Sequence, residues 1–170
     1  MSKMSKEINT PFGTGVEETG ISIMDKSDIA TVDMMEQLMS GEIKFFSSIV
    51  DDGSRESKID IYNAISREDK KIGECINEVI EVVDVVAHPI TLPDEETGEI
   101  INTVRTILVD KNGNNYVGVS NGINSALTRI FAIIGRPDNG AWHEKPVKMK
   151  IKQIQTRTGN NKVNTIELVK

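Results

Sequence analysis

Hydrophobic and polar residues alternate through the C-terminal half of the chain in a pattern that first predicts a long strand. Residues 78–87 are dominated by Val and Ile, which favours a largely buried strand. Pro89 and Pro93 then predict an interruption, because proline cannot donate a backbone hydrogen bond within a sheet. The polar residues 94–98 end in a Gly and predict a reversal of the chain.

Two more strands are expected after this loop. Residues 99–110 place apolar and polar side chains on both faces, as in a strand shared between a core and a working surface. The pair Asn112-Gly113 predicts a tight hairpin turn, since both residues accept positive φ angles. Residues 115–120 then predict a third strand.

A helix is expected next, because the hydrophobic period changes from two to about 3.6 residues. Gly135, followed by Pro137, is expected to end this helix. Its candidate N-caps are Ser120, Asn121 and Asn124, and its apolar stripe consists of Ile123, Leu127, Ile130 and Ile134. A helix with one such stripe can close the bottom of a barrel.

The alternating pattern returns near the C-terminus. Residues 147–152 predict a strand with one apolar face and one lysine face, and residues 163–169 predict the last strand. Three strands, a helix and two strands follow one another in a small Greek-key barrel of the OB type. We therefore expect a mostly β fold with a five-stranded OB-type barrel over residues 76–170.

The N-terminal part of the chain is expected to extend this barrel. Residues 1–26 have no hydrophobic period and predict a disordered or loosely ordered arm. Residues 27–75 predict a helical extension packed on the barrel. Its expected elements are a helix over 27–39, a strand or extended segment over 42–50, a helix from Ser54 with Ile59, Tyr62 and Ile65 on one flank, and a capping box at Ser66–Asp69 for a further turn.

Charge is unevenly distributed along the chain. The net charge is −6, yet residues 129–170 hold 9 Lys and Arg against 3 Asp and Glu, whereas residues 1–128 hold 11 against 23. Such asymmetry favours a localised anion-binding face near the C-terminus. The alternative is a basic segment that only offsets the acidic part.

Composition and motifs narrow the possible functions. The single cysteine, Cys75, excludes an internal disulfide and fits a reducing compartment. The apolar runs are too short to span a bilayer, and nothing after Met1 reads as a signal peptide. With His88 and His143 as the only histidines and no phosphate-binding loop, we expect neither catalysis nor a metal or other cofactor.

Binding of single-stranded nucleic acid needs cations that follow the phosphates and flat side chains that stack on bases. Lys148, Lys150 and Lys152 share one strand face at a spacing of about 6.5–7 Å, twice the rise per strand residue. Arg157 and Lys162 flank the following turn. The alternative is that the three lysines are ordinary solvated strand surface.

Flat side chains are available at several predicted positions. Tyr116 and Arg105 lie on the strands that form the usual ligand face of an OB barrel, and Trp142 with His143 precedes the lysine strand. The candidate DNA-binding residues are therefore Arg105, Tyr116, Trp142, His143, Lys148, Lys150, Lys152, Arg157 and Lys162. Alternatively, Tyr116 only covers the barrel end and Trp142 anchors its loop.

The run from Arg105 to Ser120, with Asp110-Lys111-Asn112-Gly113 before Tyr116 and an amphipathic helix after it, resembles a known family. It is similar to the single-stranded DNA-binding proteins of small bacteriophages with protein-primed DNA replication, over roughly residues 54–170. The chain departs from the shorter members by its long N-terminal arm, and it lacks the acidic C-terminal tail of the bacterial counterparts.

The resemblance implies a non-catalytic protein that coats displaced single strands without sequence choice during phage DNA replication. Its implied partners are single-stranded DNA and phage replication proteins, with no membrane, in the cytoplasm of the infected bacterial host. The alternative is an acidic phage protein that uses its negatively charged part to bind a host or viral protein.

Overall fold

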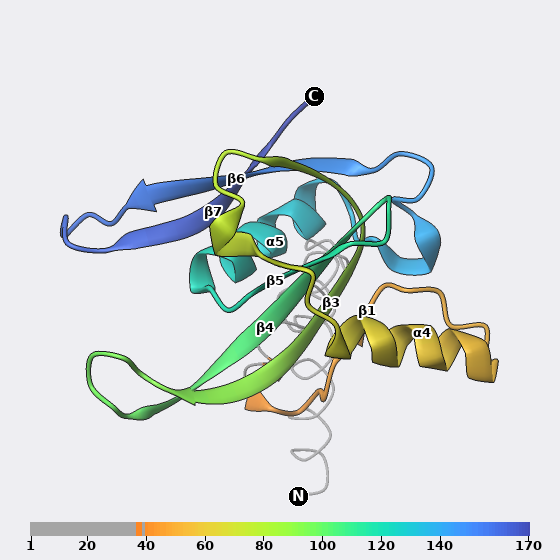
Figure 1. Ribbon diagram of the computed structural model, residues 1–170, viewed down its shortest axis with the longest axis horizontal. Coiled ribbons are helices and arrows are strands. Elements are labelled where there is room, and N and C mark those ends of the chain that lie inside the picture. The colour runs from red at the N-terminus through yellow and green to blue at the C-terminus, as the bar shows by residue number, and fades with distance from the viewer. Residues whose placement is uncertain (1–36, 39) are drawn as a thin grey trace, which may run out of the picture.

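The computed structural model describes residues 37, 38 and 40–170 (Figure 1). The arm predicted over 1–26 and most of the helix predicted over 27–39 lie outside these residues. The described part is mostly β-structure, with one curled sheet that forms about half of a barrel and two longer helices packed on it (Figure 1).

The sheet has the strand order β2-β5-β4-β3-β6-β7, and β1 pairs with β3 beside this path. Neighbouring strands are antiparallel except for β2, which pairs parallel to β5. The strands are β1 (Phe46–Ser47), β2 (Lys70–Lys71), β3 (Val79–Pro93), β4 (Ile100–Asp110), β5 (Asn115–Gly118), β6 (Val147–Gln155) and β7 (Lys162–Leu168). The helices are α4 (Arg55–Ser66), α5 (Asn121–Ile133) and the short 3-10 turns η1 (Ile72–Glu74) and η2 (Asp138–Gly140).

The sequence predicted that the first long strand is interrupted at its prolines, but the structure shows that it continues through them. β3 continues to Pro93, and Pro89 lies opposite Val104 on β4. The Val85 N–H and C=O both bond to Ser48, on the side of β3 away from β4. Every second residue after Val85 presents its backbone groups to that same side, where no strand of the described part of the chain pairs with β3 beyond Ala87. The missing N–H groups of both prolines therefore cost no ladder hydrogen bond.

The inner face of the sheet packs on α5 to form the main core. Val85, Leu108 and Tyr116 are cross-strand neighbours on this face, and all three belong to the main hydrophobic cluster. Ile123 and Leu127 of α5 complete the cluster and are 0% and 2% exposed.

The predicted stripe of α5 is wrong at its C-terminal end. Ile134 is half exposed beyond the last helical turn, whereas Phe131 is buried against Phe46, with 6.1 Å between the ring centroids. Asn124, one of the predicted caps, is buried instead and ties the helix to β4. Its side chain accepts from Thr106 Oγ1 at 2.6 Å and donates to the Val104 carbonyl.

Helix α4 packs on the opposite, outer face of the sheet. Val86, Ile107 and Val117 form a row across β3, β4 and β5, and Ala64 of α4 packs against this row. Of the three residues predicted on one flank of this helix, Ile65 packs against this cluster, whereas Ile59 and Tyr62 are exposed. The buried apolar positions of α4 are Ile61 and Ala64.

The start of α4 agrees with the predicted N-cap, whereas the predicted extra turn is absent. The Ser54 hydroxyl accepts from the Ser57 N–H at 3.1 Å. At the other end the chain leaves the helix at Arg67 with extended backbone. Asp69 accepts from the Asn115 N–H of β5 instead of capping a further turn.

The two ends of the strand order do not pair, and a seam separates β7 at one end from β5 and the short strand β2 at the other. Helix α5 covers part of the seam through Gly122, where an added Cβ would lie 2.2 Å from the Asn164 carbonyl oxygen of β7. The absence of a side chain therefore allows the first turn of α5 to lie directly against the free edge of β7.

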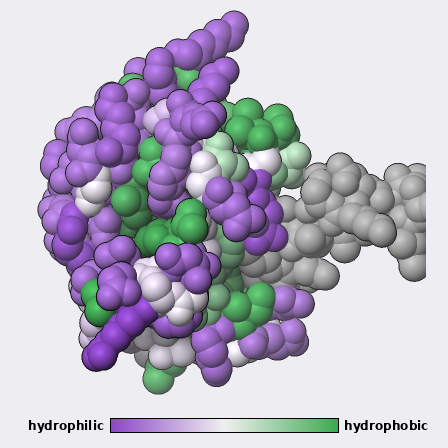
Figure 2. Space-filling model, turned by 90° about the vertical axis from the view of Figure 1, so that its right-hand side faces the viewer, coloured by the Kyte–Doolittle hydropathy of each residue, from purple (hydrophilic) through white to green (hydrophobic). Residues whose placement is uncertain are grey.

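The side of the molecule seen from the right of Figure 1 is mainly hydrophilic, with several hydrophobic residues among the polar ones (Figure 2). In the part of the chain that the structure describes, none of the helices has the length and apolar character needed to cross a membrane.

Candidate nucleic-acid interface

Three lysines of β6 line the outer face of the sheet. Their neighbours in sequence, Met149 and Ile151, point into the core and are 0% exposed, so the alternation of β6 sends Lys148, Lys150 and Lys152 outward. We call these three side chains the lysine face. It occupies the part of the outer surface over β6, whereas α4 covers the part over β3, β4 and β5.

Acidic residues lie beside the lysine face without neutralising it. Lys152 Nζ is 3.8 Å from Glu167 Oε2 on β7, and Glu81 of β3, opposite Lys148, pairs with Lys111. Exposed ion pairs of this kind contribute little free energy and are readily exchanged for other partners. The lysines therefore remain available to an incoming anion.

Lys111 belongs to this surface although the sequence analysis did not select it. Lys111 lies in the turn after β4. The turn is held beside the lysine face because the Lys111 N–H bonds to the Glu81 carbonyl of β3. Only the pairing of β3 with both β4 and β6 brings these segments together, so no local sequence pattern could have shown it.

Arg157 and Lys162 flank the turn between β6 and β7, and both are exposed. The turn is closed by the Thr156 N–H, which donates to the Asn161 carbonyl at 2.8 Å. The two cations thus lie beyond the end of β6 that carries Lys152, which extends the positive surface along the hairpin.

Both predicted stacking rings are buried, which corrects the sequence-based expectation. Tyr116 is 8% exposed and Trp142 is 4% exposed, and both belong to the main core cluster. Trp142 packs on Phe131 at 5.9 Å between ring centroids. The rings lie on the inner side of the sheet and the lysines on the outer side. The rings and the lysines, which the sequence analysis combined in one set of candidate DNA-binding residues, therefore do not share one surface.

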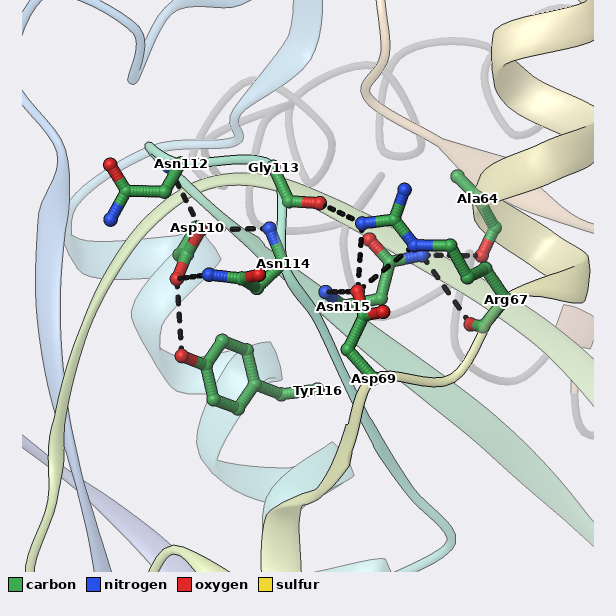
Figure 3. A network of polar contacts seen from close by, with 9 residues as sticks. All are labelled: Ala64, Arg67, Asp69, Asp110, Asn112, Gly113, Asn114, Asn115 and Tyr116. Carbon is green, nitrogen blue, oxygen red and sulfur yellow. Dashed lines mark hydrogen bonds and ion pairs between the residues drawn. The ribbon is translucent and has the colours of Figure 1, made fainter.

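Tyr116 owes its orientation to a buried carboxylate (Figure 3). The Tyr116 hydroxyl donates to Asp110 Oδ2 at 3.1 Å, and Asp110 Oδ1 accepts the N–H groups of Asn112 and Asn114. Burial first, and the neighbouring Asp110 second, raise the pKa of Tyr116 to about 12. Burial pushes the pKa of Asp110 upward, but the hydrogen bonds from Asn114, Asn112 and Tyr116 outweigh it, so that pKa is lowered.

Arg105 connects α4 to the sheet, which also differs from its predicted role on an open ligand face. Its Nη1 donates to the Ile65 carbonyl at the end of α4 at 2.7 Å, and Nη2 lies 3.7 Å from Glu68. Burial, and then the adjacent guanidinium, lower the pKa of His88, whose Nε2 lies 3.3 Å from Arg105 Nη1. The outer surface around Arg105, where the sequence predicted a ligand face, is thus covered by α4.

His143 is held at the bulge of β3. Its Nε2 lies 2.8 Å from Asp84 Oδ2, and the other Asp84 oxygen accepts from the Ser48 hydroxyl at 2.6 Å. The His143 side chain is 48% exposed while that of Asp84 is 7% exposed. This pair fixes the loop that carries the buried Trp142. The structure therefore brings the three lysines together with Arg157 and Lys162, and separates them from Arg105, Tyr116 and Trp142.

A curled, half-closed sheet with a row of outward cations is an arrangement suited to an extended anion. In residues 37–38 and 40–170, no group of three or more His, Cys, Asp or Glu side chains is placed to hold a metal ion. Over residues 40–168 the chain matches the family model of the phage single-stranded DNA-binding proteins, and it belongs to that family. This confirms the resemblance drawn from residues 105–120.

A curated relative is the single-stranded DNA-binding protein of Bacillus phage GA-1, which is 28% identical over 104 residues. The match covers 59% of this chain and 61% of the relative, so it spans about three-fifths of that protein's length. No solved structure matches the chain.

Proposed function

We propose that this protein binds single-stranded DNA without catalysis and without sequence choice, and coats displaced strands during phage DNA replication. The observation that carries the proposal is the lysine face on an open part of the sheet, in a chain that belongs to the phage single-stranded DNA-binding family. Phage replication proteins in the cytoplasm of the infected host are its natural partners.

We further propose that β3, β4, β5, β6 and β7, with α5 between the third and fourth of these strands, correspond to a five-stranded Greek-key barrel of the OB type. The antiparallel pairing of β3 with both β4 and β6 is the arrangement that such a barrel requires. In this assignment β1, α4 and β2 belong to the extension ahead of the barrel.

Phosphate contacts dominate the proposed binding mode. Alternate residues of a strand lie about 6.5–7 Å apart, which is suited to successive phosphates of an extended single strand. The lysine face offers three such cations in a row, and Arg157 and Lys162 continue the positive surface. None of these contacts reads base identity, which accounts for binding without sequence choice.

The test is a binding titration of the full chain with fluorescent oligonucleotides followed by anisotropy. We expect tight binding to oligothymidylate and to a mixed-sequence strand, weaker binding to the duplex of the same sequence, and a steep loss of affinity with added salt. Equal affinity for single strand and duplex, or no binding at low salt, would contradict the proposal.

A further inference from the structure

The seam between β5 and β7 contains a cavity of about 300 Å³. This volume is at the lower end of the range found for small-molecule sites, about 300–1,000 Å³. Its walls are largely apolar and include Val117, Val119 and Ile123, while Lys71, Arg105 and Glu68 contribute the charges. An apolar cavity with cations at its wall suits a flat heterocycle that carries a phosphate.

Two glycines, Gly73 and Gly118, line the cavity. Gly118 ends β5 where an added Cβ would lie 3.0 Å from Ile72, so it lets η1 approach the strand. Gly73 of η1 is exposed, and the nearest atom to an added Cβ there is the Asn164 amide nitrogen at 3.4 Å. A larger side chain at Gly73 would therefore extend into the cavity rather than into the backbone.

The cavity lies next to the lysine face, with only β7 between them. Asn164 of β7 lines the cavity, and the next residue, Thr165, pairs with Lys152 of β6. Paired strands are about 4.8 Å apart, so a single strand of DNA that leaves Lys152 reaches the cavity after crossing one β-strand. Lys71 and Arg105 lie on the far wall, which provides cations on both sides of β7.

The buried positions of Tyr116 and Trp142 leave the proposed DNA path without the two stacking rings that the sequence offered. We propose that the seam cavity receives one base of the bound single strand, with Lys71 and Arg105 facing its phosphate. This inference rests on the proposed function. Among the described residues that line the cavity, Glu68 is the one acidic residue, and it opposes the phosphate. Its Oε2 lies 3.7 Å from Arg105 Nη2, which places it beside that cation.

The inference is tested with two fluorescent probes of equal length, an oligothymidylate and a chain of abasic nucleotides with the same phosphates. Gly73→Leu fills the cavity and is expected to weaken binding of the oligothymidylate at least about fivefold, the loss of one weak base contact. Its affinity for the abasic chain is expected to equal that of the wild-type protein, because the phosphates are unchanged.

Two charge variants test the proposed cavity site independently of Gly73→Leu, and they do so even if Gly73→Leu does not fold. Lys71→Gln is expected to weaken binding of both probes and to lower the salt slope by about 0.7, the value for one phosphate of a single strand. Glu68→Gln is expected to strengthen binding of both probes. Lys44→Gln, which removes an exposed cation ahead of β1, is the matched control and is expected to leave the affinity unchanged.

The outcomes separate the two proposals. If the wild-type protein binds neither probe, the proposed function itself is wrong. If it binds, but folded Gly73→Leu loses no affinity or loses it equally for both probes, the cavity does not hold a base. Shifts of the same sign in Lys71→Gln and Glu68→Gln would also overturn the inference and leave the proposed function intact.

Discussion

Single residues decide the geometry of the turn after β4. Asp110 is buried yet ionised, because it accepts two backbone N–H groups and the Tyr116 hydroxyl at once (Figure 3). On the far side of the turn, Asp69 pairs with Arg67 and accepts from the Asn115 N–H, and the pKa of Asp69 is lowered. The two carboxylates thus fix the start of β5, Asp110 from the turn before it and Asp69 from the segment after α4.

Ionisation of Tyr116 provides a direct test of this network. In the variant Tyr62→Phe, where Tyr116 is the remaining tyrosine, absorbance of the tyrosinate is expected to rise with a midpoint near pH 12. The folded pKa is raised, so its contribution to stability is complete below pH 10 and is lost as the pH rises toward 12. The urea-unfolded chain is the control, with a midpoint near 10. A midpoint near 10 in the folded variant would show that the ring is not buried beside Asp110.

Gly122 offers a second test at the scale of one residue. Replacing Gly by Ala within a helix normally stabilises it by up to about 1 kcal/mol. Here the added Cβ would meet the Asn164 carbonyl of β7, so Gly122→Ala is expected to lower the free energy of unfolding by about 1–3 kcal/mol. Thermal or urea unfolding measures this change. Ser125→Ala, at an exposed position of the same helix, is the control, and stabilisation by Gly122→Ala would contradict the described contact.

At the scale of elements, α4 has the largest consequence for function. It covers the outer face of β3, β4 and β5 and is fastened there by the hydrogen bonds of Arg105 and Asn115 to its last carbonyls. The open part of the outer surface is therefore the part over β6 that carries the lysine face. We therefore place the proposed DNA path along the hairpin of β6 and β7.

The loop before β6 gives a prediction at this scale. Trp142 is packed inside the main core, so its fluorescence is expected to resist quenching by acrylamide and to change little when oligothymidylate is added. The anisotropy of the labelled oligonucleotide reports binding in the same samples. Strong quenching of Trp142 at DNA saturation would show that the ring contacts bases and would restore the sequence-based assignment.

Local patterns in the sequence predicted these elements well and their partners poorly. The alternation of residues 147–152 correctly separated the lysines from the core residues Met149 and Ile151, because period two depends only on strand geometry. The burial of Trp142 and the position of α4 depend on contacts between distant segments. A local period does not encode such contacts, and of the flank predicted for α4 only Ile65 packs against the sheet.

At the scale of the whole molecule, the charge asymmetry of the sequence places cations and acidic residues on different parts of the surface. The excess of cations in residues 129–170 lies largely on and around the hairpin of β6 and β7, away from the acidic turn between β3 and β4. In the view of Figure 1 both hairpins point to the left, the β6-β7 hairpin above and the β3-β4 hairpin below. A polyanion would therefore be attracted to one hairpin and repelled by the other.

The salt dependence of binding tests the central claim, that the lysine face contacts the phosphates of single-stranded DNA. Anisotropy titrations with oligothymidylate at several salt concentrations would compare the wild-type protein with a variant that carries Lys148→Gln, Lys150→Gln and Lys152→Gln. The matched control changes three exposed cations of the N-terminal part to Gln, namely Lys44, Arg55 and Lys58. We expect the triple variant of the lysine face to bind more weakly, with a salt slope smaller by about 2 because three phosphate contacts are lost, while the control keeps the wild-type slope. Equal slopes for a folded lysine-face variant and the wild-type protein would contradict the claim.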